Sequence, residues 1–150
     1  MVENFESQDL RGRDFSGRDL TGAIFFGANL SGANLTNANL TNANLEGARL
    51  FGANLSGANL NGANTSRAFM AFANLTNVNL EGARLFGANL TNANLTGANL
   101  EGATLFGANL TGAKLTNAIL DENPKMSEEK EELSKVECMP DGGPGRKYEK

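Results

Sequence analysis

The stretch NANLTNANLEGARLFGANLSGANL, residues 37–60, repeats a five-residue unit built on alanine, asparagine and leucine. The same register runs from Phe5 to Leu120 without insertion or deletion, and 19 of its 24 central positions are leucine. The other central residues are Phe5, Phe15, Phe25, Thr65 and Met70. A repeat this regular predicts one small structural unit stacked upon itself many times.

The spacing inside the unit predicts its shape. The residue two before each centre, at every fifth position from 23 to 118, is alanine except at Val78. Residues two apart in an extended chain point to the same side, so this alanine and the central residue face the same way. Two residues after the centres from Leu10 to Leu115, 20 of 22 positions are glycine or asparagine, the exceptions being Arg67 and Phe72. These two residue types tolerate the positive φ of a type II turn. Each unit is therefore predicted to be a short extended segment followed by a corner.

An α-helix does not fit this period. Five-residue spacing would spread the leucines around the helix, and each glycine would cost about 1 kcal/mol. A chain that turns repeatedly by the same corner closes into coils and stacks on itself, which predicts a solenoid.

Units such as ANLSG at residues 28–32 and ANLTG at residues 93–97 resemble those of the pentapeptide-repeat proteins. The resemblance covers residues 3–122, about four-fifths of the chain. It implies an all-β fold, a right-handed quadrilateral parallel β-helix with four units per coil. About six coils would then occupy a domain of residues 1–122.

The two ends of the repeat differ from its middle. In the first coil, polar residues stand where alanine is expected: Glu3, Gln8, Arg13 and Arg18. An apolar shaft could not enclose them without partners, so we expect a solvent-facing cap, with Phe5, Phe15 and Phe25 plugging the shaft behind it. After Leu120 the residues favour a capping helix over 123–137, with Met126, Leu133 and Val136 as its apolar stripe, and a disordered tail over 138–150.

The residues suited to catalysis are scarce. The chain has no histidine and a single cysteine, Cys138, so it forms no intramolecular disulfide and offers few groups for acid-base or nucleophilic chemistry. The glycines match no phosphate-binding loop. We expect no enzyme, no catalytic residue, no cofactor and no metal. The column Glu81, Glu101 and Asp121 allows a calcium site, but a solvated acidic edge is the favoured interpretation.

Because a coil is expected to contain 20 residues, residues 20 apart should lie above one another. Asn34, Asn54, Asn74 and Asn94 then form a column that we expect to be hydrogen-bonded between coils. The same 20-residue spacing places exposed phenylalanines together on two neighbouring sides of the coils. The unit at residues 68–72, AFMAF, lacks both the asparagine and the glycine of the repeat. The candidate partner-binding residues are Phe51, Phe69, Phe72, Phe86 and Phe106. Exposed apolar patches mark interaction sites, although rings lying flat over alanine and glycine would need no partner.

These features favour a non-catalytic structural or protein-binding scaffold whose partner is another protein or a second copy of the chain, as a monomer or an end-to-end dimer. The resemblance implies an alternative, a DNA-mimicking protein that binds gyrase. Residues 1–120 carry eight acids and seven bases, a net charge of 7 − 8 = −1. Duplex DNA carries one negative charge per about 1.7 Å of axis, so this balance favours the scaffold. A purely structural rod is the third possibility.

The chain lacks a basic stripe, a run of about 20 apolar residues and a signal peptide. We therefore expect neither nucleic-acid nor membrane binding, and a location in the cytoplasm.

Overall fold

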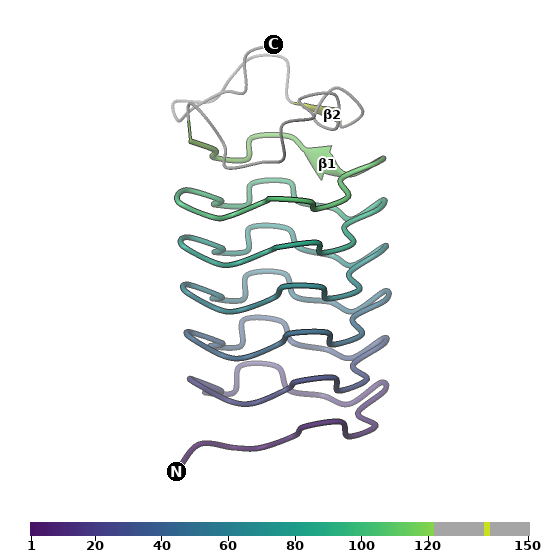
Figure 1. Cartoon of the computed structure of the whole chain (residues 1–150), viewed down its shortest axis with the longest axis vertical. Helices are drawn as coiled ribbons and strands as arrows, with labels where there is room; N and C mark the ends of the chain where they lie inside the picture. The colour runs from purple at the N-terminus through teal and green to yellow at the C-terminus, as the bar shows by residue number, and fades with distance from the viewer. Residues whose placement is uncertain (122–136, 139–150) are drawn as a thin grey trace.

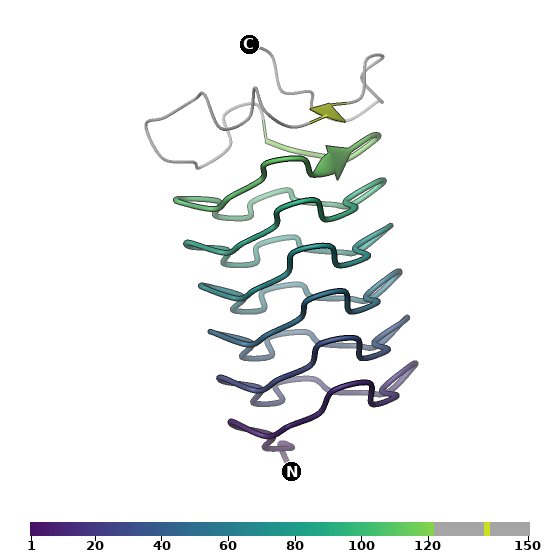
Figure 2. The same cartoon turned by 90° about the vertical axis from the view of Figure 1, so that its right-hand side faces the viewer.

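The computed structural model describes residues 1–121 and 137–138. The chain winds into flat coils stacked in a rod, with the N-terminus at one end (Figures 1 and 2). Parallel bridges join each paired residue to the residue 20 positions later, from Asn4 with Ile24 to Asn99 with Ile119. Since four five-residue units make 20 residues, each coil has four sides, and residues 1–120 make 120 / 20 = 6 coils. The solenoid with four units per coil is thus confirmed.

Each side of a coil is too short for a conventional strand, because a turn follows every short extended segment. The carbonyl oxygen of each centre from Phe5 to Leu115 accepts a hydrogen bond from the N–H three residues on, as in Leu30 with Ala33 at 2.9 Å. The residue two after the centre has positive φ, for example 68° at Gly32 and 57° at Asn37. These are the values that the third position of a type II turn requires, which explains the glycine and asparagine in the repeat.

Backbone hydrogen bonds hold neighbouring coils together. The N–H of Leu30 donates to the carbonyl oxygen of Arg49 in the next coil at 2.6 Å, and the N–H of Gly32 donates to that of Phe51 at 3.0 Å. The N–H of Asn29 donates in the opposite direction, to Gln8 at 2.9 Å. The backbone N–H and C=O groups of each side therefore form hydrogen bonds to the coils above and below, as they do between the strands of a parallel sheet.

The core is the interior of the shaft, filled by the leucine and alanine of each unit. Leu30, Leu50 and Leu90 have no exposed surface. Thr65 is the one polar central residue, and its hydroxyl donates to the carbonyl oxygen of Arg84 at 2.8 Å. Within the described residues no buried side-chain nitrogen or oxygen lacks a hydrogen-bond partner.

The first coil closes the N-terminal end as predicted. The ring centroid of Phe25 lies 4.8 Å from that of Phe5 and 5.9 Å from that of Phe15, and Phe15 and Phe25 are fully buried. The guanidinium carbon of Arg18 lies 5.3 Å from the centroid of Phe15, and its Nη2 donates to both carboxylate oxygens of Glu3 at 2.7 Å. An exposed polar cap therefore covers an aromatic plug.

At the other end the structure has two short strands, β1 (Lys114–Leu115) and β2 (Glu137–Cys138). They pair in parallel, with Lys114 opposite Glu137. The described residues include no helix, and the helix predicted over 123–137 falls outside them apart from Glu137, which lies in β2. Cys138, placed in a disordered tail by the sequence, is also in β2. The free backbone edge of the last coil provides the partner that this strand needs.

The asparagine column is built differently from the prediction. The side-chain oxygen of Asn34 accepts hydrogen bonds from the N–H and the hydroxyl of Thr36 at 3.0 and 2.6 Å, and Asn74 and Asn94 repeat this pattern with Thr76 and Thr96. The carboxamide oxygens are thus used within their own coil. An asparagine just before a turn finds the N–H two residues on at hydrogen-bonding distance, which satisfies the oxygen locally.

Candidate protein-binding surface

The five predicted partner-binding residues lie on two neighbouring sides of the rod and the corners beside them. All are exposed, from 42% for Phe86 to 56% for Phe51 and Phe72. We call this set the aromatic band; its members are Phe51, Phe69, Phe72, Phe86 and Phe106. About half of the surface of each of these residues is therefore accessible to a partner.

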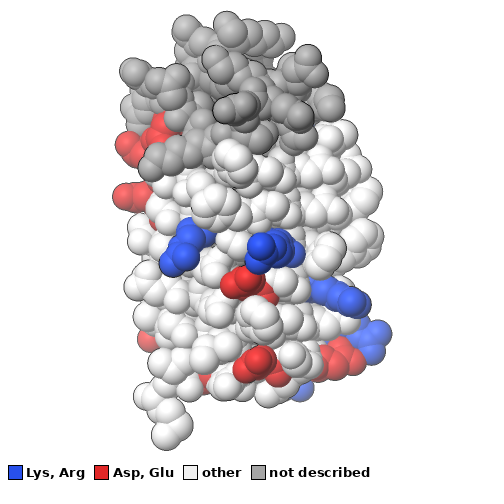
Figure 3. All heavy atoms as spheres, viewed as in Figure 1, with Lys and Arg blue, Asp and Glu red and all other residues white. Residues whose placement is uncertain are grey.

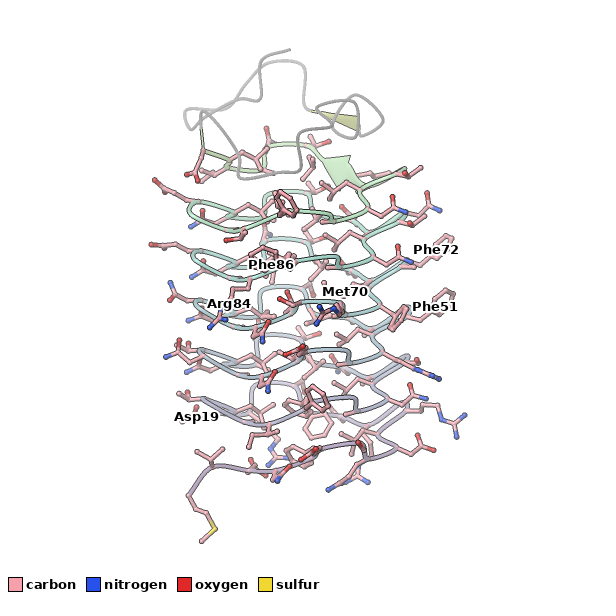
Figure 4. All side chains as sticks on the ribbon, in the orientation of Figure 1. Asp19, Phe51, Met70, Phe72, Arg84 and Phe86 are labelled. Carbon is pink, nitrogen blue, oxygen red and sulfur yellow. The ribbon has the colours of Figure 1, made fainter. Side chains whose placement is uncertain are left out.

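Two pairs of rings make contact within the aromatic band. The centroids of Phe86 and Phe106, one coil apart on the same side, are 6.4 Å apart. The centroids of Phe51 and Phe72 are 5.5 Å apart and their planes are tilted by 59°. Figure 4 shows Phe51 and Phe72 projecting together from one edge of the rod. Each pair offers a larger apolar surface than a single ring would.

Phe69 and Arg67 lie between the two pairs. The N–H of Arg67 donates to the carbonyl oxygen of Phe86 at 2.7 Å, which places Arg67 directly beside the Phe86 coil. Phe69 follows two residues later on the next side, and its own bridge joins it to Arg49. The aromatic band therefore runs obliquely around one corner, from Phe106 to Phe51.

The sixth exposed phenylalanine on the rod, Phe26, shares the column of Phe86 and Phe106. Glu46 and Ser66 occupy the two intervening coils of that column, so Phe26 stands apart from the aromatic band. Its exposed fraction, 43%, is close to that of Phe86, which makes it a matched control position.

Arginines accompany the aromatic band, a feature that the sequence interpretation did not include. Arg67 Nη1 lies 3.1 Å from Glu46 Oε1, and Asn64 Nδ2 donates to Glu46 Oε2 at 3.3 Å. Arg49 and Arg84 form no ion pair with any of the described residues. The 20-residue arithmetic alone places Arg49 beneath Phe69, so this signal was present in the sequence.

The remaining charged groups offer little chemistry. A hydrogen bond from the Arg11 side chain lowers the pKa of Asp9 to about 2. The pKa of Asp14 is lowered by the backbone N–H of Ser16, and that of Asp19 by the Thr21 hydroxyl. Such shifts hold the carboxylates ionised, whereas a general acid needs a raised pKa. In the acidic column, both carboxylate oxygens of Asp121 accept hydrogen bonds from the N–H of Gly102, at 3.1 Å. No three residues of the described part form a group that could hold a metal ion.

The chain is a solenoid of the β-helix class. The sequence model for pentapeptide repeats matches residues 4–36, 19–57, 53–92 and 83–121. The chain belongs to the pentapeptide-repeat family.

Several solved structures resemble the chain. A pentapeptide-repeat protein from the thylakoid lumen of Arabidopsis thaliana is 35% identical, over 79% of this chain and 72% of that one, with a TM-score of 0.47. HetL from the cyanobacterium Nostoc, involved in heterocyst differentiation regulation, is 32% identical, over 93% and 78%, with a TM-score of 0.40. QnrB1, a plasmid-mediated fluoroquinolone resistance protein, is 24% identical, over 91% of this chain and 62% of that one, with a TM-score of 0.74. This last likeness shows the fold alone.

No curated protein matches the sequence. Over the described part of the chain, no helix is long and apolar enough to cross a membrane.

Proposed function

We propose that this pentapeptide-repeat protein is a non-catalytic scaffold that binds a protein partner, or a second copy of itself, through the aromatic band. The exposure of five phenylalanines on two adjacent sides carries this proposal. A contiguous exposed apolar patch is typical of interaction sites, and aromatic residues dominate the binding energy of protein interfaces. The rod supplies rigidity, because backbone hydrogen bonds fix every side of each coil.

A non-catalytic role is supported by the composition. The chain has no histidine, and its resolved pKa shifts hold carboxylates ionised at the N-terminal cap. The aromatic band itself contains no nucleophile or proton acceptor.

DNA mimicry with gyrase as its target is the alternative, and the charges argue against it. A mimic needs a dense line of negative charge along the rod. Here arginines stand among the acids, and the face seen in Figure 3 carries blue basic side chains over its middle and lower coils. With eight acids and seven bases in residues 1–120, the rod is close to neutral.

The experiment that tests the scaffold is a pull-down from native lysate, read by mass spectrometry, after circular dichroism has verified each variant's fold. We expect a partner captured by wild type to be lost with Phe86→Asp and with Phe86→Asp/Phe106→Asp. Phe26→Asp, which introduces the same charge in the same column outside the aromatic band, should retain it. Loss in all three variants would contradict a specific role for the aromatic band.

Two further outcomes distinguish the alternatives. Gyrase subunits captured equally by wild type and both Phe86 variants would support DNA mimicry. The mass of the purified protein in solution tests self-association: a dimer that Phe86→Asp/Phe106→Asp converts to a monomer would make the second copy the partner. No partner in any form would indicate a purely structural rod.

A further inference from the structure

One coil carries bulky side chains at two corners where the rest of the rod has small ones. Arg67 and Phe72 have φ values of 58° and 61°, in the left-handed region. The other corners hold glycine or asparagine, apart from Ser7. A side chain with a Cβ costs about 1–2 kcal/mol in this conformation, and asparagine tolerates it best because it bonds locally. Backbone strain of this kind concentrates at functional sites.

These two corners bracket one side of the rod. Between them stand Phe69 and Ala71, and one coil below lie Arg49 and Phe51. Ala71 is the smallest residue of its column in the middle coils, where Phe51 and Thr91 lie below and above it. Ala71 is therefore a small residue next to three large exposed side chains, those of Phe51, Phe69 and Phe72. Figure 4 shows Phe51 and Phe72 projecting from the same edge of the rod.

Two arginines form a basic border beside these rings. Arg67 is positioned by Glu46 but its side chain is still 77% exposed. Arg49 lies beneath Phe69 and forms no ion pair with the described residues. With two arginines against one half-buried glutamate, the border has an excess of positive charge. We call this group of two arginines and three phenylalanines the Arg–Phe site. Its members are Arg49, Phe51, Arg67, Phe69 and Phe72.

We propose that the Arg–Phe site binds an acidic segment of a protein partner, with an apolar side chain against Ala71 between the rings and carboxylates at Arg49 and Arg67. The proposal rests on the proposed function and specifies the chemistry of the partner. Arginine pairs with carboxylate through directional, charge-assisted hydrogen bonds, and exposed aromatic rings beside a small residue suit an apolar side chain of a partner. A cationic ligand, which a cage of rings alone would attract, is repelled by the arginines.

A polynucleotide is also anionic and stacks on aromatic rings, but it requires a basic track that follows its backbone. The Arg–Phe site offers two arginines beside Glu46, and the coils above it present asparagine and threonine on the same side: Asn89, Thr91, Asn109 and Thr111. The short basic border therefore fits a peptide carboxylate better than a chain of phosphates.

The test uses a displayed library of random short peptides, selected on immobilised full-length protein and counter-selected on Phe51→Ser/Phe72→Gly. Enriched peptides are synthesised, and their affinity is measured by fluorescence anisotropy at low and high salt. We expect the enriched peptides to place aspartate or glutamate next to an apolar side chain. Arg49→Glu/Arg67→Glu should weaken their binding by at least about tenfold at low salt. Arg84→Glu, an arginine outside the Arg–Phe site, should leave it unchanged.

Enrichment of neutral or basic peptides, or no enrichment above the counter-selected variant, would overturn the inference. So would binding that is insensitive to Arg49→Glu/Arg67→Glu, or tighter binding of a single-stranded oligothymidine than of the acidic peptides. If any of these occurs while Phe86→Asp still loses its partner from lysate, the acidic-segment inference fails and the scaffold stands.

Discussion

The side chain of Asn37 occupies the space that a Cβ on Gly57, one coil further along, would need. Asn42 with Gly62, Asn77 with Gly97 and Asn92 with Gly112 show the same relationship. At these four corners, glycine in the next coil therefore leaves room for the asparagine side chain. The choice between the two corner residues is governed by contact between coils as well as by φ.

Gly57→Ala should consequently destabilise the protein more than Gly32→Ala. Both glycines have φ near 68°, so alanine costs about 1–2 kcal/mol at either from backbone strain. No heavy atom lies within 4 Å of a Cβ at Gly32, whereas at Gly57 it meets the side-chain oxygen of Asn37, and moving that side chain should add about 1 kcal/mol. Urea denaturation measures the difference. Adding Asn37→Gly to Gly57→Ala should remove the extra loss of stability. Equal destabilisation by Gly57→Ala and Gly32→Ala would show that the contact with Asn37 has no effect on stability.

The N-terminal cap should weaken in acid. Because the folded-state pKa of Asp9 lies at about 2, below its ordinary 3.8, its stabilising contribution is complete above the ordinary value and is lost as the pH falls through about 2. The lowered pKa values of Asp14 and Asp19 act in the same direction. The protection of the amide hydrogens of the first two coils, relative to their exchange in an unfolded chain at the same pH, should therefore fall between about pH 4 and pH 2.

A matched variant is available for this prediction, because later coils use asparagine for the same hydrogen bond to the N–H two residues on. Asp9→Asn/Asp14→Asn/Asp19→Asn should keep the turns, as Asn29, Asn34 and Asn39 do. Its first two coils should show a shallower dependence on pH than those of wild type. Identical pH profiles would mean that the three carboxylates are not the titrating groups.

Phe72→Gly and Arg67→Gly should each raise the free energy of unfolding, by about 1 kcal/mol, because glycine relieves the positive φ. Each should also weaken the binding of acidic peptides, since each removes a side chain of the Arg–Phe site. Chemical denaturation and anisotropy on the same samples measure both effects. A loss of stability in both variants would show that the two side chains are retained for packing.

Phe25→Ala should cost about 3–5 kcal/mol, because it removes a fully buried ring that contacts the rings of Phe5 and Phe15. Phe106→Ala removes a ring that is 52% exposed and should cost much less. Thermal or urea denaturation compares them. Comparable losses would mean that the aromatic band supports the fold as much as the plug does.

Much of the fold could be predicted from the repeat because its information is local. Alanine and leucine two residues apart define the inner side of an extended segment, and glycine or asparagine two residues after the centre sets the turn. A 20-residue coil then places Phe106 over Phe86. The family resemblance supplied the number of sides, which local spacing alone leaves open.

What the sequence determined by itself is a shaft of leucine and alanine with turned corners, since every unit repeats the same local geometry. The contact between Phe72 and Phe51 was decided only by the tertiary structure, because the two residues occupy different columns. The positive φ of Phe72 sets the direction of its side chain, and its ring thereby meets that of Phe51. The tertiary structure likewise joined Glu46 to Arg67, 21 residues apart, and paired β2 with the open edge at β1. Contacts between columns depend on side-chain direction across coils, and a five-residue period does not encode it.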